Sequence, residues 1–384
     1  MNIFIAANTT WYIFNFRSRL IAALKEQGHR ITVLAPRDKY VSRIEALGVR
    51  HLHLEMDNAG TNPLYELVTL ARLAALLRRE RPALILSFTP KVNIYVSLAA
   101  RLSGIPVVAN VSGLGTGFMR GGLLKTVMTG LYRLAFCHPY TVFFQNEEDR
   151  SEFVRAGLVD SKRAKRLPGS GVDLERFTPE QHTGSRKHCV FLLVARLLWD
   201  KGVGEFVEAA RQLKSKYLEA EFRLLGFLDV QNPSAVPRSD IERWAAEGVI
   251  TYLGSTEDVR PYYNDADCVV LPSFYREGTP RTLLEGASMG LPLITTDAVG
   301  CHDTVENGTT GFLCKKKDAG DLAEKMERMI LLTPEQRAEM GKAGRAKMER
   351  EFDERIVIGR YMAAILETGS SMGLPRKTGF SVST

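Results

Sequence analysis

Four short apolar runs in the first half of the chain alternate with longer segments whose apolar side chains recur at helical spacing. The runs have the length and composition of buried strands: NIFIAAN (2–8), RITVLAP (30–36), ALILSFT (83–89) and PVVANVS (106–112). The segments between them fit amphipathic helices at residues 16–29, 63–82 and 92–105. Strands that alternate with helices of this length predict a parallel sheet with helices on both faces.

The same alternation starts again after a stretch rich in proline and glycine at residues 166–180. Strand-like runs follow at 188–195, 221–226, 268–274 and 291–297, and helical patterns follow at 202–217, 282–290 and 320–332. We therefore predict an α/β protein with two Rossmann-like, doubly wound parallel-sheet domains that face a cleft. The predicted parts are an N-terminal domain (1–168), a C-terminal domain (169–350), a final helix packing back toward the N-terminal domain (351–366) and a disordered tail (367–384).

The composition is that of a globular protein long enough for two domains. The chain has 384 residues, of which 45% are hydrophobic and 25% charged. No run reaches the roughly 18 uninterrupted apolar residues of a membrane helix, and the N-terminus lacks the basic region of a signal peptide. We therefore expect a cytoplasmic location. The five cysteines show no C-x-x-C pair and no metal-type spacing, which favours small buried thiols.

Positive charge is concentrated in the first half. Residues 1–180 hold 24 Lys and Arg against 15 Asp and Glu, a balance of +9, whereas the rest hold 27 against 29, a balance of −2. A lipid headgroup, a diphosphate or a nucleic acid would be attracted to the first half, although the excess also fits plain solubility. The chain lacks interleaved aromatic and basic residues, which disfavours a nucleic-acid partner.

Candidate site residues follow the predicted strands of the second half. In open parallel sheets, ligands bind beyond the carboxyl ends of the strands. Arg196 and Lys201 come at or just after one strand end, where two cations can neutralise a diphosphate. With Thr279 as cap and Pro280 as first helical residue, the next helix would offer free N–H groups to an anion.

Two glutamates accompany this predicted helix start: Glu277 lies just before Thr279 and Pro280, and Glu285 lies inside the helix. Carboxylates repel phosphate, but they accept hydrogen bonds from hydroxyl groups. A ligand that carries both a diphosphate and sugar hydroxyls is a nucleotide sugar. The pattern therefore indicates a binding site for a nucleotide sugar.

These residues resemble motifs of the retaining glycosyltransferases of family 4, which have the GT-B fold. Glu277 and Glu285 have seven residues between them, as in that family's E-x7-E motif. ARLLWDKG is similar to the family's Arg-x4-Lys-Gly loop, and GSGVDLERF to its Gly-Val-Asp-x3-Phe segment. The resemblance runs from about Asn2 to Leu366. FNFRSRLIAAL, FTPKVNIYVSLAA and NVSGLGTGF resemble a bacterial branch that extends sugars on diphospho-undecaprenol and includes N-acetylgalactosaminyltransferases.

The resemblance implies a retaining enzyme that moves a sugar, expected to be an N-acetylhexosamine, from a UDP-sugar to a lipid-diphosphate-linked saccharide in surface polysaccharide assembly. Arg196 and Lys201 would stabilise the departing diphosphate. Glu277 would contact the transferred sugar, and Glu285 the ribose. The other expected donor-binding residues are Gly226, Gly278, Thr279 and Pro280. No metal or other cofactor is expected, because the fold generally works without one.

For the acceptor, the loops of the basic half supply the candidates Arg17, Lys91, Gly113, Gly115 and Gly117. The glycines form G-x-G-x-G rather than the dinucleotide pattern G-x-G-x-x-G, so we reject a NAD site. We expect them to form a tight loop that permits close backbone approach.

The basic amphipathic stretch at 120–136 fits contact with the cytoplasmic face of the inner membrane, and it also fits an ordinary helix that covers the sheet. A peripheral membrane enzyme is the resulting expectation. Two alternatives stay open: a nucleotide-sugar epimerase or hydrolase of the same fold, and a non-enzymatic binder of anionic ligands.

Overall fold

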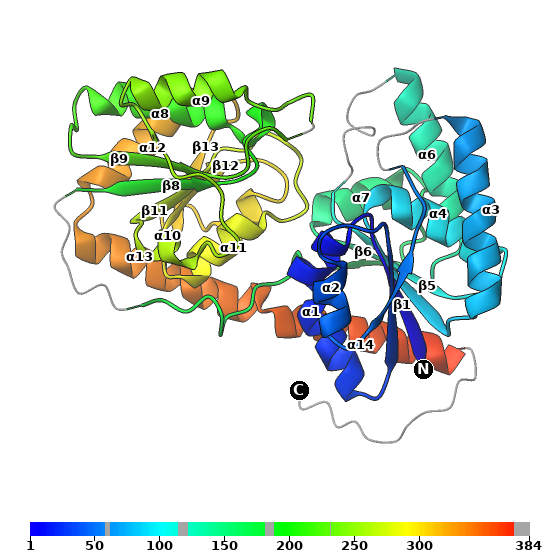
Figure 1. Cartoon of the computed structure of the whole chain (residues 1–384). Helices are drawn as coiled ribbons and strands as arrows, with labels where there is room; N and C mark the ends of the chain where they lie inside the picture. Colours follow the sequence, from blue (N-terminus) through cyan, green and yellow to red (C-terminus); the bar gives the residue numbers. More distant parts are fainter. Residues whose placement is uncertain (58–61, 114–121, 181–187, 231, 372–384) are drawn as a thin grey trace. The chain divides into compact units, whose positions relative to one another are not determined.

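The computed structural model describes residues 1–57, 62–113, 122–180, 188–230 and 232–371 (Figure 1). The chain forms two compact units. One comprises Met1–Leu167 together with Val357–Thr384, and the other comprises Pro168–Ile356. The chain therefore passes from the first unit to the second at residue 168 and returns at residue 357.

The N-terminal unit is built on a seven-stranded sheet with the order β3-β2-β1-β4-β5-β6-β7, in which all neighbours are parallel. The strands are β1 (Asn2–Ala6), β2 (Arg30–Ala35), β3 (Arg50–His53), β4 (Leu84–Phe88), β5 (Val107–Val111), β6 (Thr141–Phe144) and β7 (Ala164–Arg166). The strand order reverses between β1 and β4, as in a doubly wound fold.

Helices cover both faces of this sheet. Buried side chains join one face to α3 (Pro63–Glu80), α4 (Pro90–Arg101), α6 (Gly122–Phe136) and α7 (Glu147–Arg155). The other face packs against α1 (Thr10–Glu26), α2 (Val41–Ala46) and α14 (Glu354–Ser371). The alternation of apolar runs and amphipathic segments thus gives the layered arrangement that it predicts.

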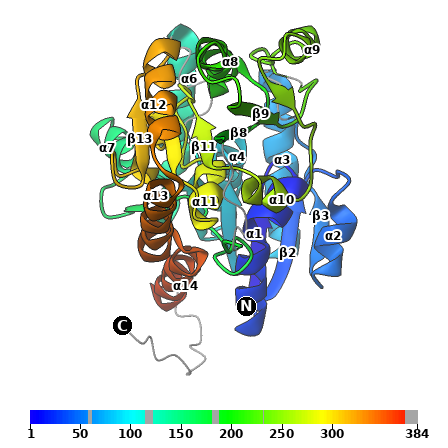
Figure 2. The same cartoon turned by 90° about the vertical axis from the view of Figure 1, so that its left-hand side faces the viewer.

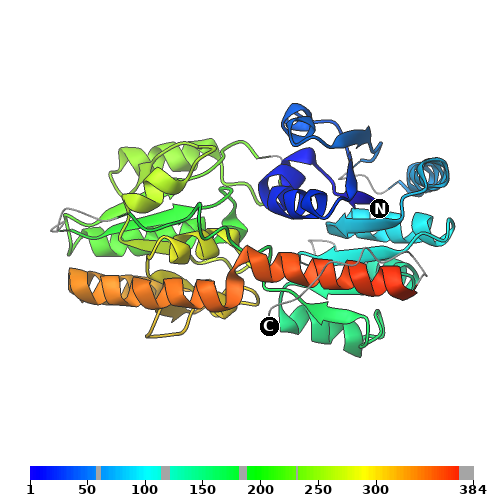
Figure 3. The same ribbon diagram turned by 90° about the horizontal axis from the view of Figure 1, so that it is seen from below.

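The last helix, α14, returns the end of the chain to the N-terminal unit (Figure 3). Val357, Tyr361 and Ile365 recur on one helical face and are buried in the core of this unit. Asn110 at the end of β5 donates to the Tyr361 hydroxyl at 2.6 Å. The predicted helix end at residue 366 is wrong, because Thr368 is also buried and the helix continues to Ser371. Of the predicted tail, 372–384 lies outside the described residues.

The C-terminal unit has a six-stranded parallel sheet in the order β10-β9-β8-β11-β12-β13. Its strands are β8 (Val190–Val194), β9 (Glu221–Leu225), β10 (Thr251–Tyr252), β11 (Cys268–Leu271), β12 (Leu293–Thr296) and β13 (Gly311–Cys314). Its helices are α8 (Val203–Lys214), α9 (Arg238–Ala246), α10 (Arg260–Asn264), α11 (Arg281–Ser288), α12 (Ala319–Leu331) and α13 (Pro334–Lys347).

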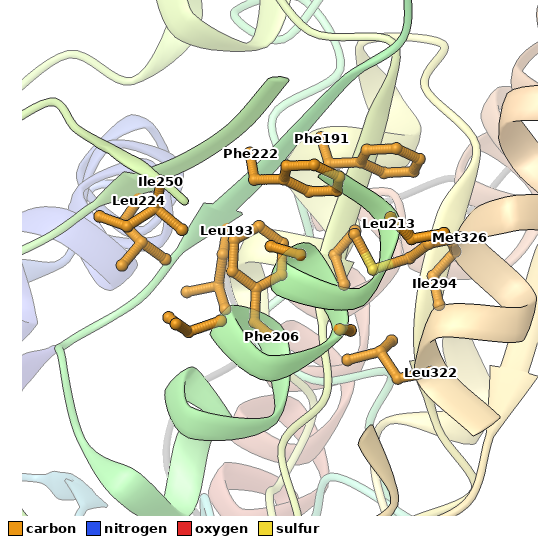
Figure 4. Close-up of a cluster of buried hydrophobic side chains, with 14 of the residues drawn as sticks. Phe191, Leu193, Phe206, Leu213, Phe222, Leu224, Ile250, Ile294, Leu322 and Met326 are labelled. Atoms are coloured by element: carbon orange, nitrogen blue, oxygen red, sulfur yellow. The ribbon is translucent and has the colours of Figure 1, made fainter. Parts of the chain in front are cut away.

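The core between this sheet and helices α8, α9 and α12 is rich in aromatic side chains (Figure 4). Phe191 of β8 and Phe222 of β9 stack with ring centroids 5.5 Å apart and planes inclined by 6°. Phe206 of α8 meets Phe222 edge-on, and α8 packs beside α12 (Figure 2). On the opposite face, Tyr263 of α10 and Leu283 of α11 are fully buried. Packing on both faces fixes the strand ends from which the candidate site residues extend.

Among the described residues, no helix combines the length and the apolar character needed to cross a bilayer.

Candidate active site

The candidate catalytic residues gather where the strand order of the C-terminal sheet reverses. Strands β8 and β11 are neighbours in the sheet although two strands lie between them in the sequence. The segment 195–202 follows β8, and the segment 272–280 follows β11. Adjacent parallel strands release these two loops at the same edge, which is the usual ligand-binding position in an open α/β sheet.

Lys201 and Glu277 form an ion pair between the two loops. The Lys201 side chain is 15% exposed and the Glu277 side chain 14% exposed, so both charges are largely withdrawn from water. The Ser273 hydroxyl lies 3.1 Å from the same Glu277 oxygen and can donate to it. The sequence assigned these two charges to different parts of a ligand, whereas the structure shows them paired. The pair offers a ligand two kinds of contact: Lys201 can bind a phosphate, and Glu277 can accept a hydrogen bond from a hydroxyl group.

Close backbone contacts hold the loops in place. Gly202 has φ of 76°, and a side chain there would bring its Cβ to 2.2 Å from the Pro272 carbonyl oxygen. Gly226, after β9, would bring a Cβ to 1.7 Å from the Ala195 carbonyl oxygen. Neither position accepts a side chain without displacing backbone. Gly226, predicted to bind the donor, thus has a clear packing function against the loop that carries Arg196.

Arg196 is exposed at this edge, two residues after the end of β8. Burial raises the pKa of the Tyr275 phenol, the Glu277 charge adds to the rise, and the positive charge of Arg196 opposes it. Arg196 is therefore electrostatically coupled to the Glu277 loop. The structure brings the three predicted catalytic residues, Arg196, Lys201 and Glu277, to one edge of the sheet.

Glu285 lies within α11 and has its own partners. Arg281, one turn earlier, donates from Nε to one carboxylate oxygen at 2.8 Å, and the Tyr263 hydroxyl lies 3.3 Å from the other. Burial raises the pKa of the Glu285 carboxyl, although Arg281 and Tyr263 oppose the rise. Sequence reasoning missed Arg281 and Tyr263. The i, i+4 spacing of Arg281 and Glu285 was a signal that could have revealed the first.

The start of α11 differs from the prediction by one residue. Helix α11 begins at Arg281, and Pro280 is its N-cap with an extended backbone (φ −66°, ψ 118°) and no side-chain capping bond. Thr279 is therefore not the cap. The Thr279 side chain is buried and packs against Gly169. A Cβ atom at position 169 would lie only 2.8 Å from it. Gly278 is also buried. These residues connect Glu277 to the helix that carries Glu285.

In the N-terminal unit, Lys91 lies in the first turn of α4 rather than on a loop. Its ammonium group forms an ion pair with Glu66 of α3 at 2.6 Å. Gly113 follows β5 with φ of 128°, a conformation that favours glycine. Gly115 and Gly117 lie outside the described residues, so the predicted glycine loop is described only at its first member.

The predicted loop position of Arg17 is wrong. Thr9 caps α1 by accepting from the Tyr12 N–H, so the helix includes Arg17 in its interior. The Arg17 side chain is only 2% exposed. Its guanidinium carbon lies 4.4 Å from the centre of the Phe88 ring and 5.9 Å from that of Tyr361. Because these contacts bury it inside the unit, Arg17 is a cation–π element of the core rather than an exposed acceptor ligand.

Four of the five cysteines are buried, as predicted, but Cys137, the residue directly after α6, is exposed. Burial raises the pKa of the Cys301 thiol, in the loop after β12, to about 12. That thiol stays protonated near neutral pH and is a poor nucleophile.

Comparison with known proteins identifies the family. Residues 188–331 match the family model described as "Glycosyl transferases group 1", and residues 16–170 match that of the "Glycosyl transferase 4-like domain". The two matched ranges contain most of both sheets described above.

Two curated relatives are similar over much of their length. An N,N'-diacetylbacillosaminyl-diphospho-undecaprenol alpha-1,3-N-acetylgalactosaminyltransferase of Campylobacter jejuni is 32% identical over 91% of this chain and 94% of its own. A UDP-Gal:alpha-D-GlcNAc-diphosphoundecaprenol alpha-1,3-galactosyltransferase of Escherichia coli is 28% identical over 66% of this chain and 67% of its own.

Solved structures agree on the fold. HepE of Anabaena, in complex with UDP and glucose, matches 96% of this chain and 100% of its own with a TM-score of 0.76 and 19% identity. Sucrose-phosphate synthase from Thermosynechococcus elongatus matches 97% of this chain and 100% of its own, with a TM-score of 0.77 and 18% identity. The two-sheet architecture is thus the GT-B fold, as predicted. Fold, family-model matches and full-length similarity together show that this chain belongs to glycosyltransferase family 4 and is a glycosyltransferase.

Proposed function

We propose that the enzyme transfers a sugar, an N-acetylhexosamine, from a UDP-sugar to a saccharide linked to a lipid diphosphate, with retention of anomeric configuration. The observation that carries the proposal is the Lys201–Glu277 pair between the two loops, with exposed Arg196 at the same edge. The names of the Campylobacter and Escherichia relatives specify diphospho-undecaprenol-linked acceptors, and the name of the second specifies a UDP-sugar. The HepE complex contains UDP.

In the proposed reaction, the bond between the anomeric carbon and the diphosphate oxygen of the donor breaks. A new bond forms between that carbon and an acceptor hydroxyl oxygen on the same face of the sugar. The acceptor's proton passes to an oxygen of the departing diphosphate, so no side chain is required as a base. Arg196 and Lys201 offset the negative charge that develops on the diphosphate, where stabilisation accelerates the reaction most.

The two glutamates bind hydroxyl groups in this proposal. Glu277 accepts from a hydroxyl of the transferred sugar and keeps Lys201 at the site through their ion pair. Glu285 accepts from the ribose, with Arg281 and Tyr263 orienting its carboxylate. We further propose that the reaction proceeds without a metal ion, because two side-chain cations are placed to supply the positive charge.

The lipid-linked acceptor implies a membrane surface. On the first two turns of α3, an apolar group is exposed: Leu64 (75%), Leu67 (63%), Val68 (47%) and Tyr65 (40%). Leu64, Leu67 and Val68 follow helical i, i+3, i+4 spacing and so share one face. Helix α6 exposes Val127 and Leu134 beside Arg133, and both helices pack against α4 (Figure 1). Exposed apolar side chains on a basic domain favour peripheral binding at the cytoplasmic face of an anionic membrane.

A transfer assay with product analysis tests the proposal. Purified enzyme is incubated with UDP-N-acetylhexosamine and a short-chain polyprenyl-diphosphate-linked saccharide, with and without EDTA. We expect an elongated lipid whose new linkage has the donor's anomeric configuration by NMR, at the same rate with chelator. Donor consumption that is equally fast without acceptor would contradict transfer and support the epimerase or hydrolase alternative. Inversion at the anomeric carbon would contradict retention.

A further inference from the structure

The segment 232–236, which follows β9 in the sequence, pairs with the loop that carries Lys201. Ala235 and Leu198 form an antiparallel bridge. The Trp199 N–H donates to the Ser234 carbonyl at 2.8 Å, and the Val236 N–H donates to the Leu197 carbonyl at 2.9 Å. These main-chain bonds hold the segment against the loop, whatever its side chains.

Ser234 adds a side-chain contact to this pairing. The Asp200 N–H donates to the Ser234 hydroxyl oxygen at 3.2 Å. The Ser234 N–H in turn donates to the Asn232 side-chain oxygen at 2.8 Å, which fixes the turn on which the serine lies. The Ser234 hydroxyl is thus held in place, and it accepts a hydrogen bond from the backbone of Asp200, the residue directly before Lys201.

The other side of Asp200 is bonded to the Glu277 loop. Its carbonyl oxygen accepts from the Phe274 N–H at 3.1 Å and from the Tyr275 N–H at 3.2 Å. The Ser273 hydroxyl lies 3.1 Å from the same carbonyl and also 3.1 Å from the Glu277 carboxylate. The Asp200 N–H therefore donates to Ser234, and the Asp200 carbonyl accepts from the loop that carries Glu277.

We propose that Ser234 is a positioning residue that sets Lys201 against Glu277 during sugar transfer. The inference rests on the proposed function, in which Lys201 stabilises the departing diphosphate. A lysine ammonium sits at the end of a flexible stem, so its placement depends on where the backbone of residues 200 and 201 is held. Because a displacement of about 1 Å at a reacting group can cost up to roughly 100-fold in rate, losing the bond from the Asp200 N–H to the Ser234 hydroxyl should have a measurable effect.

A double-mutant cycle tests the inference. Single-turnover transfer rates are measured for Ser234→Ala, Lys201→Met and the double variant with enzyme in excess, so that slow reactions are followed. The donor KM is measured separately at steady state, with donor in excess over enzyme. We expect Ser234→Ala to lower the rate about 5- to 20-fold with the donor KM within about threefold of wild type. In the Lys201→Met background the same change should have less than about a twofold effect, because the group that it positions is absent.

Two further variants separate positioning from folding. Ser234→Thr keeps a hydroxyl and should recover most of the rate. Ser215→Ala removes an exposed hydroxyl at the end of α8 that donates to the nearby Gln212 carbonyl, and it should leave the rate unchanged. If Ser234→Ala costs the same factor with and without Lys201, the positioning role is wrong while the proposed function stands. If Lys201→Met itself leaves transfer unchanged, the catalytic assignment of Lys201 fails, and the positioning inference fails with it.

Discussion

The Glu285 side chain is 15% exposed and has two hydrogen-bond partners, Arg281 and Tyr263. Its pKa in the folded protein is raised, chiefly by burial. An acid whose folded pKa exceeds its unfolded pKa binds protons more tightly when folded. Its contribution to stability therefore falls as the pH rises from the unfolded value through the folded one.

We expect the Glu285→Gln variant to lack this loss. The free energy of unfolding of the variant minus that of wild type should therefore increase as the pH rises from about 4 to about 7.5, which means that the variant gains stability relative to wild type. Urea unfolding of both proteins at several pH values measures the difference. Glu324→Gln, on the exposed face of α12, is the matched control and should show little pH-dependent difference. If the stability of Glu285→Gln relative to wild type instead decreased with rising pH, Arg281 and Tyr263, rather than burial, would control the pKa of the Glu285 carboxyl group.

At this scale, the sequence identified residue types better than residue contacts. The spacing of Glu277 and Glu285, and that of Arg196 and Lys201, identified these four residues as candidates for a donor site, and all four lie on the C-terminal unit. It could not reveal that Lys201 is paired with Glu277, because that contact joins loops 76 positions apart in the sequence. Arg17 was misplaced because a buried arginine among aromatic rings has the same sequence signature as an exposed one.

Helices and strands followed the apolar pattern closely, whereas their ends did not. The sheet-forming runs became β1, β2, β4 and β5, and β8, β9, β11 and β12. The start of α11 was displaced by one residue, and the end of α14 by five. Ends depend on local backbone angles and on tertiary burial, such as that of Thr368, which periodicity alone does not encode.

Close contact between the loops after β8 and β9 gives a prediction at the scale of elements. Gly226→Ala would place a methyl group 1.7 Å from the Ala195 carbonyl oxygen, so the two loops must separate. We expect a loss of about 1–3 kcal/mol in the free energy of unfolding, together with reduced turnover. Differential scanning calorimetry and transfer assays measure the two effects.

Gly320→Ala on α12 is the control for this substitution. The nearest atom to its new Cβ is a side-chain oxygen of Asp318 at 3.5 Å, an ordinary contact. This variant should be as stable as wild type or up to about 1 kcal/mol more stable, because alanine favours helices. If Gly226→Ala were as stable and as active as Gly320→Ala, the loops after β8 and β9 could separate to accept the methyl group without loss of stability.

For the whole molecule, we expect membrane binding through the exposed apolar face of α3. Leu64→Glu with Leu67→Glu places two negative charges on that face, and these oppose both burial in a bilayer and attraction to anionic lipid. We expect at least about a tenfold loss of co-sedimentation with vesicles that contain phosphatidylglycerol, while transfer to the short-chain acceptor in the absence of vesicles is unchanged.

Leu218→Glu in the C-terminal unit provides the control. Leu218 is 79% exposed, as much as Leu64, but it lies before β9 on the other unit. It should leave vesicle binding unchanged. Equal binding by the α3 variant and wild type would contradict a membrane role for α3.

We propose that Lys201, Glu277 and Arg196, at the carboxyl ends of the strands of the C-terminal sheet, bind and activate a nucleotide sugar. The most direct test is binding and turnover of a panel of UDP-, GDP- and dTDP-sugars by wild type, Glu277→Gln and Arg196→Ala. We predict that wild type binds and turns over a UDP-sugar, and that each substitution lowers turnover by about 100-fold or more. If no nucleotide sugar bound, or if both variants turned over the donor as fast as wild type, these three residues would not form the donor site.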